Sequence, residues 1–217
     1  MIIWNKKDIL YEDRQILVCR KHAGMAVQSA RIGQMDMESS LRNYLKGGYI
    51  GIIQRLDQPV EGVLVFAKTQ KAAAALNRQH QNGKMKKYYL AAFTGKPESM
   101  SGTWEDFLLK DSRTNTSKVV REGMGQSKRA VLHYRVLGWQ ADVGLAEVLL
   151  ETGRHHQIRV QMAHAGMPLV GDRKYNPGQN SQEPLALCSA KLGFQHPVTK
   201  KQLEFQVQPA GMAFKRH

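Results

Sequence analysis

The chain has 217 residues, and lysine and arginine outnumber aspartate and glutamate by 32 to 18, which gives a net charge of +14 and a pI near 9.9. No apolar stretch approaches the ~20 residues that span a bilayer, and segment 1–11 lacks the apolar core of a signal peptide. Cys19 and Cys188 are too few and too far apart for a disulfide framework or a zinc cluster, which fits a reducing cytoplasm. The basic excess indicates a polyanionic partner, most often a nucleic acid.

The first predicted elements are two short strands at 9–11 and 16–19, which flank a polar turn. Asp36 is placed to cap a helix with apolar positions at helical spacing, and Gly47 stops that helix. The next unit is a strand at 50–53, a turn marked by proline and glycine, and a buried strand at 63–67.

Thr69 is placed to cap a second helix that ends near Gly83. The basic run 84–87 then leads into a strand at 88–93, either as a solvated strand end or as a phosphate contact. The polar, basic stretch 110–129 is typical of a mobile hairpin or loop.

Alternating residues at 130–137 and 145–150 predict neighbouring strands joined through 138–144. A third helix is expected over 155–165, and a last strand over 203–207. Short strands with three helices favour an α+β fold with a mixed, mainly antiparallel sheet and flanking helices. No linker composition divides the chain, so we expect a single domain over residues 1–217.

Asp57 is predicted to lie where a strand meets a loop, a common place for a reactive group. In an extended chain Arg55 and Asp57 project to one side, and Leu56 points the other way into the core. The alternative is an ordinary Asx turn of Asp57 with Gln58 and Pro59.

Arg159 is expected to share one helix stripe with His155, Ile158 and Met162. A charge on an apolar face needs an anion, and Asp57 is a natural candidate. The alternative is an arginine whose stem packs while its head reaches water.

Segments 54–69 and 151–160 together resemble the signature of the RluA family of pseudouridine synthases. In that family an Arg-Leu-Asp stretch carries the catalytic aspartate, and a Thr-Gly-Arg-x-His-Gln-Ile-Arg stretch supplies its arginine partner. The resemblance also includes Lys87-Tyr88-Tyr89-Leu90-Ala91, the run from Ala163 to Tyr175, Leu187, and 194–197. It spans nearly the whole chain, in the right order.

Some positions depart from the family pattern. Gln54 replaces the histidine that usually precedes Arg-Leu-Asp, and Val60 and Glu61 replace a usual Thr-Ser pair. Cys188 replaces a usual histidine, and His22 replaces a usual proline in the turn 21–24. The last change should loosen that turn. None removes the aspartate, tyrosine or arginine, so they affect the expected subfamily and RNA target more than the activity.

The resemblance implies one role for each matched site residue. Asp57 would act on a flipped-out uridine as nucleophile or base, and Arg159 would pair with Asp57 and keep it ionised. Tyr89 would stack on the base. Arg55 would fill the vacated space or hold the phosphate, and Leu187 would be a packing wall for the uracil.

The basic side chains of the stretch 110–129 are candidates for RNA contacts, although they can also serve solubility alone. The residues expected to hold RNA are Lys118, Arg121, Lys128 and Arg129.

The resemblance implies an enzyme, an RNA pseudouridine synthase that isomerises specific uridines in structured rRNA or tRNA. We expect no cofactor and no metal, a cytoplasmic monomer, no membrane partner, and no N-terminal RNA-binding extension. The main alternative is a non-catalytic RNA-binding or ribosome-assembly protein on the same fold, which predicts a damaged Asp-Tyr-Arg set.

Two other enzyme classes are less favoured. A glycosidase needs a second positioned carboxylate, for which Glu61 is near in sequence. A metal enzyme is disfavoured because His155, His156 and His164 lack metal-binding spacing. His155 and His156 should point apart on the helix, in core or supporting roles.

Overall fold

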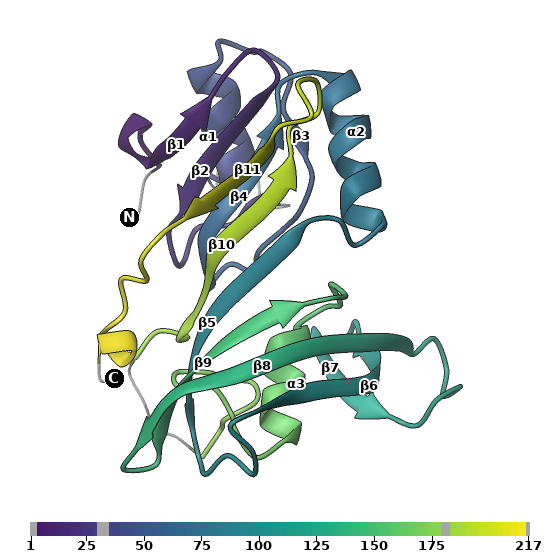
Figure 1. Ribbon diagram of the computed structural model, residues 1–217, viewed down its shortest axis with the longest axis vertical. Helices are drawn as coiled ribbons and strands as arrows, with labels where there is room; N and C mark the ends of the chain where they lie inside the picture. Colours follow the sequence, from purple (N-terminus) through teal and green to yellow (C-terminus); the bar gives the residue numbers. More distant parts are fainter. Residues whose placement is uncertain (1–3, 30–34, 179–182, 216–217) are drawn as a thin grey trace. The chain divides into compact units, whose positions relative to one another are not determined.

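The computed structural model describes residues 4–29, 35–178 and 183–215, so the two ends of the expected domain 1–217 lie outside the described residues. The described residues form two compact units (Figure 1). The first unit is Met1–Lys87 with Ser189–Gln208, and the second is Tyr88–Cys188 with Pro209–His217. The chain passes between them inside strands β5 (Lys86–Thr94) and β10 (Leu187–Gln195), and a third time between Gln208 and Pro209. Because two of these crossings lie inside strands, no linker composition marks them.

The first unit is built on antiparallel strands with two helices, as the sequence predicts. Strand β2 pairs with β1 and with β4, β4 also pairs with β3, and β10 pairs with β11. The elements not yet bounded are η1 (Lys6–Asp8), β1 (Ile9–Glu12), β2 (Ile16–Lys21), α1 (Met37–Tyr44), β3 (Gly51–Ile52), β4 (Glu61–Ala67), α2 (Gln70–Gln81) and β11 (Gln202–Gln206).

Capping residues fix both helices of the first unit. The Asp36 carboxylate accepts a hydrogen bond from the Ser39 amide at 2.8 Å, and the Thr69 hydroxyl accepts one from the Ala72 amide at 3.1 Å. Helix α2 packs on β3 and β4, and every residue of β4 is buried. The core of this unit therefore lies around β4, whose first residue follows the Asp57 loop.

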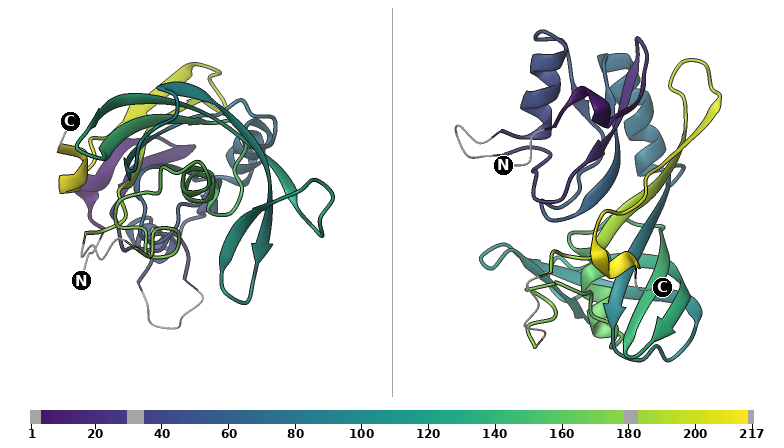
Figure 2. Two further views of the ribbon diagram at one scale, coloured as in Figure 1. Left: turned by 90° about the horizontal axis from the view of Figure 1, so that it is seen from below. Right: turned by 90° about the vertical axis from the view of Figure 1, so that its left-hand side faces the viewer.

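The second unit is a curved antiparallel sheet in the order β5-β9-β8-β6-β7. Its strands curve around helix α3 (Figure 2). The elements not yet bounded are β6 (Ser101–Asp111), β7 (Thr116–Val120), β8 (Lys128–Gln140), β9 (Val143–Leu150), α3 (Gln157–His164) and η2 (Met212–Lys215). These strands and helices confirm the predicted α+β class.

Two local predictions need correction, and a third becomes more specific. Residues 138–144 are not a connection, because β8 and β9 meet at a tight turn in which Ala141 and Asp142 have φ of 48° and 60°. The basic stretch 110–129 contains the turn and second strand of the β6–β7 hairpin, as the hairpin alternative predicts, and then a loop and the start of β8. Lys87 is not a solvated strand end: its side chain is buried, and this burial lowers the pKa of its ammonium.

Helix α3 begins at Gln157, two residues later than predicted. His156 precedes it in a left-handed conformation with φ of 55° and no side-chain cap. His155 therefore lies outside the helix and shares no stripe with Arg159. The rings of His155 and His156 stack at 3.8 Å between centroids instead of pointing apart.

No helix in the described part of the chain is long and apolar enough to cross a membrane.

Candidate active site

The Asp57 loop belongs to the first unit. Leu56 is buried in the core, as the alternation predicts, while Arg55 is exposed and Asp57 is partly exposed. The Val60 amide donates to the Asp57 carbonyl at 3.0 Å, which closes a turn over Gln58 and Pro59. The loop thus holds Asp57 at the surface of a rigid strand framework.

Lys21 is the fully buried anchor of this loop, and the sequence reasoning did not single it out. Its ammonium donates to the carbonyls of His22, Gln58 and Val60 at 3.1, 3.0 and 2.5 Å. Three donors thus meet three acceptors, and two of the acceptors, Gln58 and Val60, belong to the turn that follows Asp57. Burial lowers the pKa of Lys21 to about 7, although the nearby negative charges of Asp57 and Glu61 act in the opposite direction.

The turn 21–24 is tied to the same loop. The Gly24 amide donates to the Gln58 carbonyl at 2.8 Å, and the Gln58 side chain donates back to the Gly24 carbonyl at 2.9 Å. His22, which replaces the family's proline, lies 2.7 Å from the Asp8 carboxylate through Nε2. The contact between His22 and Asp8, an ion pair or a hydrogen bond, therefore anchors the turn that a proline ring stiffens in other family members.

We expect Lys21→Met to change the pH dependence of stability. With a pKa of about 7 in the folded state and 10.5 in the unfolded state, the unfolded parent binds more protons between these values. The free energy of unfolding of the parent should therefore rise relative to Lys21→Met by about 3 kcal/mol between pH 7 and 10. Denaturant unfolding at several pH values measures this. Lys71→Met, at an exposed position of α2, is the control and should give a flat difference; a flat difference for Lys21→Met would refute the burial argument.

The carboxylate of Glu61 takes part in a structural ion pair. Its carboxylate receives a hydrogen bond from the Arg20 guanidinium at 2.8 Å, and its side chain is buried. A carboxylate held in an ion pair is a poor second acid for glycoside hydrolysis, which keeps that alternative disfavoured.

Arg159 lies in the second unit and is buried, so the interpretation that its head reaches water is wrong. Its Nε and Nη2 donate to the two carboxylate oxygens of Asp172, each at 2.8 Å. Asp172 is also buried, and the guanidinium lies 5.1 Å from the centroid of the Tyr175 ring. A bidentate pair fixes the plane of the guanidinium and engages one edge of it. The expected pairing of Arg159 with Asp57 stays a prediction.

The loop that carries Asp172 is pinned at several points. The Asp172 carboxylate accepts from the amides of Lys174 and Tyr175 at 3.0 and 3.2 Å. Gly171 has φ of 72°, and a Cβ there would lie 2.3 Å from the Pro184 carbonyl oxygen, so no other residue fits. The position of Arg159 is therefore set by a rigid loop as well as by its own helix.

Tyr175 connects this pair to the residues before α3. Its hydroxyl accepts from the Ser117 amide at 2.8 Å and lies 2.8 Å from His156 Nδ1. Because the Ser117 amide can only donate, the tyrosine proton is available to His156. His156 thus has a supporting role, as the sequence predicts.

Tyr89 and Leu187 are the other predicted site residues in the second unit. Tyr89 lies on β5 opposite Val148 of β9, and Leu187 is the first residue of β10. Both are largely buried. Asp57 and Arg55 therefore come from the first unit, and Tyr89, Arg159 and Leu187 from the second. Their roles toward a uridine remain predictions.

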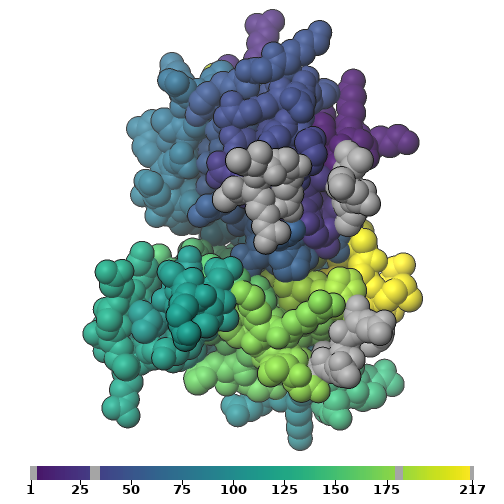
Figure 3. Space-filling model, turned by 180° about the vertical axis from the view of Figure 1, so that it is seen from behind, coloured from purple at the N-terminus to yellow at the C-terminus, as the bar shows by residue number. Residues whose placement is uncertain are grey.

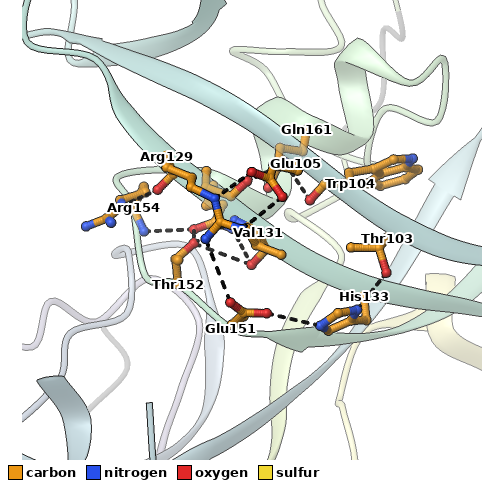
Figure 4. Close-up of polar contacts among 12 residues, drawn as sticks. Thr103, Trp104, Glu105, Arg129, Val131, His133, Glu151, Thr152, Arg154 and Gln161 are labelled. Atoms are coloured by element: carbon orange, nitrogen blue, oxygen red, sulfur yellow. Dashed lines mark hydrogen bonds and ion pairs between the residues drawn. The ribbon is translucent and has the colours of Figure 1, made fainter. Parts of the chain in front are cut away.

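The four predicted RNA-contact residues differ in their surroundings. Arg129 is bound to Glu105 by two hydrogen bonds, at 2.5 and 2.9 Å, and lies 3.9 Å from Glu151 (Figure 4). Glu151 in turn lies 3.4 Å from His133. Lys118, Arg121 and Lys128 are exposed. Arg129 is thus partly neutralised on the protein, and the other three residues are better placed for RNA.

Among the described residues, no three His, Cys, Asp or Glu side chains are grouped as a metal site would require.

A protein-family model described as RNA pseudouridylate synthase matches residues 15–164. Ribosomal large subunit pseudouridine synthase D of Zymomonas mobilis is 36% identical over 222 residues, which cover 93% of this chain and 68% of that protein. YhcT of Bacillus subtilis, an uncharacterized RNA pseudouridine synthase, is 36% identical over 203 residues, which cover 90% of this chain and 66% of its own length. The chain thus spans about two thirds of the length of these relatives.

The fold has a solved counterpart in human RNA pseudouridylate synthase domain containing 4, with a TM-score of 0.76 at 23% identity. The match covers 94% of this chain and 89% of the human chain. At that identity the likeness concerns the fold alone. The family match, in contrast, contains Asp57, Tyr89 and Arg159. The chain belongs to the RluA family of RNA pseudouridine synthases, enzymes that isomerise uridine to pseudouridine in RNA.

Proposed function

We propose that this protein converts specific uridines in structured ribosomal or transfer RNA to pseudouridine, with Asp57 as the catalytic carboxylate. The observation that carries the proposal is that Asp57, Tyr89 and Arg159 are all present within the matched segment 15–164. A non-catalytic assembly factor on this fold has no need of all three. The name of the Zymomonas relative makes large-subunit ribosomal RNA the first substrate to test.

The proposed chemistry needs few groups because the reaction is an isomerisation. The bond between N1 of uracil and the ribose breaks, the base turns, and C5 bonds to the ribose while its proton leaves and N1 gains one. No water, hydride or phosphate is exchanged. One carboxylate, a dry pocket and firm positioning therefore suffice.

Each other residue holds the uridine or Asp57. Tyr89 stacks on the flipped base, and Leu187 closes the pocket beside the uracil. Arg159, with its plane fixed by Asp172, keeps Asp57 ionised. Arg55, exposed next to the turn, fills the space that the base leaves or holds its phosphate. Base extrusion costs a few kcal/mol, which stacking and phosphate contacts offset.

We further propose that the protein acts in the cytoplasm, whose reducing conditions suit its two buried cysteines, Cys19 and Cys188, and that it acts as a monomer.

The direct test incubates the purified protein with unmodified transcripts of large-subunit ribosomal RNA and of transfer RNAs, followed by mapping of pseudouridine at single-nucleotide resolution. We expect pseudouridine at one or a few discrete positions. Tight binding to these transcripts with no pseudouridine in any of them would instead favour the RNA-binding or ribosome-assembly function.

The four candidate RNA-contact residues should contribute to RNA affinity through phosphate contacts. Replacement of Lys118, Arg121, Lys128 and Arg129 by glutamine is expected to weaken binding and to flatten its salt dependence, because each lost phosphate contact lowers the slope of log K against log salt by about 0.7 to 0.9. Binding titrations at several salt concentrations measure the slope. Arg129→Gln alone should change it little, since Glu105 already holds that guanidinium. An unchanged slope in the fourfold variant would contradict the assignment.

A further inference from the structure

A cavity of about 320 Å³ lies in the second unit, at the base of the β6–β7 hairpin. The space-filling view shows the teal residues of this hairpin at the surface, beside the green residues that follow β9 (Figure 3). The polar lining consists of Lys110, Ser112, Ser117, Gln126, Lys128, Arg154 and His155. The remaining lining residues are Leu108, Leu109 and Gly153. Among these described lining residues none carries a carboxylate, so the cavity favours an anion.

The strand register explains why positive and apolar groups meet here. On β6, Leu108 lies opposite Lys128 of β8, and Lys110 lies opposite Ser117 of β7. Directly opposed residues of antiparallel strands share a face, as do residues two apart on one strand. The side chains of these four residues therefore lie on one face of the sheet. Leu108 makes this face apolar, and Lys110 and Lys128 add positive charge to it.

The cavity exists because α3 covers only part of this face. Leu108 and Ala130 pack against Val160 of α3, with Val119 and Tyr175 beside them. Since α3 begins only at Gln157, the face beyond its first turn has no helix over it. The left-handed residue before α3 brings the preceding segment across the opening instead, and Gly153 to His155 of that segment line it.

Hydrogen bonds hold the walls of the cavity in place. The Ser117 hydroxyl lies 2.8 Å from His155 Nδ1, and His155 Nε2 lies 3.1 Å from the side-chain oxygen of Asn115. Arg154 Nε donates to the Arg129 carbonyl at 2.8 Å. In Figure 4 the terminal nitrogens of Arg154 point away from the other residues drawn. Hydrogen bonds between the surrounding residues thus fix the backbone and side chains that carry the cationic groups of the cavity.

We propose that this cavity binds one unpaired nucleotide of the RNA substrate, distinct from the target uridine. Ligand cavities begin near 300 Å³, so this volume suits a single base with its phosphate. Leu108 offers an apolar wall to a base face, while Lys110, Lys128 and Arg154 attract its phosphate. None of the residues expected to act on the target uridine lines the cavity. The inference rests on the proposed function only in taking RNA as the ligand.

The test uses single-stranded hexauridylate with the full chain. Two pocket variants are compared: Gln126→Trp, which fills the cavity from an exposed loop without a charge change, and the pair Lys110→Gln with Lys128→Gln. The charge-matched control is Lys71→Gln with Lys201→Gln, two exposed lysines of the first unit. We expect both pocket variants to bind more weakly, with a dissociation constant about tenfold larger, as for the loss of one base contact. The control should change the dissociation constant much less. In leucine-methyl NMR of the parent, hexauridylate should shift the methyl signals of Leu108, and those of Leu76 in the core of the first unit should stay unmoved.

Three outcomes separate this inference from the proposed function. Equal loss of affinity in the two lysine pairs, with no effect of Gln126→Trp, overturns the pocket in favour of general electrostatics. Unshifted methyl signals of Leu108 overturn it as well, even if the parent forms pseudouridine. Loss of binding in both pocket variants supports the pocket even if the parent forms no pseudouridine in any transcript, and in that case only the proposed function fails.

Discussion

Asp57→Asn is expected to abolish pseudouridine formation, with a loss of about 10⁴-fold or more in the single-turnover rate. The amide has nearly the shape of the carboxylate, but it neither attacks the ribose nor accepts a proton at neutral pH. Because Asp57 is partly exposed on a turn closed by backbone bonds, the variant should fold and bind RNA like the parent. Rapid-quench assays on the mapped transcript measure the rate.

The matched control for Asp57→Asn is Asp142→Asn. It makes the same chemical change in the β8–β9 turn, where φ of 60° suits asparagine as well as aspartate. This control should keep the parental rate. Pseudouridine formation by Asp57→Asn at a rate near that of the parent would remove Asp57 from the mechanism and leave it as a charge partner of Lys21.

The elements that were predicted well are those with local causes. Asp36 and Thr69 cap the helices that follow them, and both bonds are present in the structure. The alternation around Leu56 likewise places this residue in the core. Capping residues and strand alternation act within a few residues of their own position, so they can be recognised directly in the sequence.

The features that were missed depend on residues far apart in the chain. Lys21 gains its role from carbonyls 37 and 39 positions away, and burial, which a sequence does not display, lowers its pKa. The left-handed turn at His156 delays α3, although nothing in the spacing of 155–165 marks it. Strand β10 escaped prediction because it is buried on both faces and has little alternation.

The partner of Arg159 shows the same limit. The need of Arg159 for an anion was inferred from its apolar neighbours, and that need is real, since Arg159 is buried. Asp172, which meets it, lies in a loop that spacing alone does not bring to the helix. The arginine therefore has a structural partner in its own unit, beside the catalytic partner that we propose.

We expect Asp172→Asn to be strongly destabilising. Asparagine keeps an acceptor for the amides of Lys174 and Tyr175, so the change acts on the pair with Arg159, which loses the negative charge and the acceptor of its Nε. A buried guanidinium without its carboxylate costs about 3 to 5 kcal/mol, which lowers the melting temperature by about 10 °C in a chain of this size. Thermal unfolding measures the shift. Asp111→Asn, at the last residue of β6, is the control for an aspartate outside the buried ion pair and should shift the melting temperature far less.

The double variant Arg159→Met with Asp172→Leu separates the structural role of the pair from its catalytic role. Replacing a whole buried ion pair by apolar side chains of similar volume is often neutral or stabilising, so the double variant should melt well above Asp172→Asn. If Arg159 also acts on Asp57, the recovered fold should still make pseudouridine at least about 100-fold more slowly than the parent. A stable double variant with the parental rate would show that Arg159 serves only the fold.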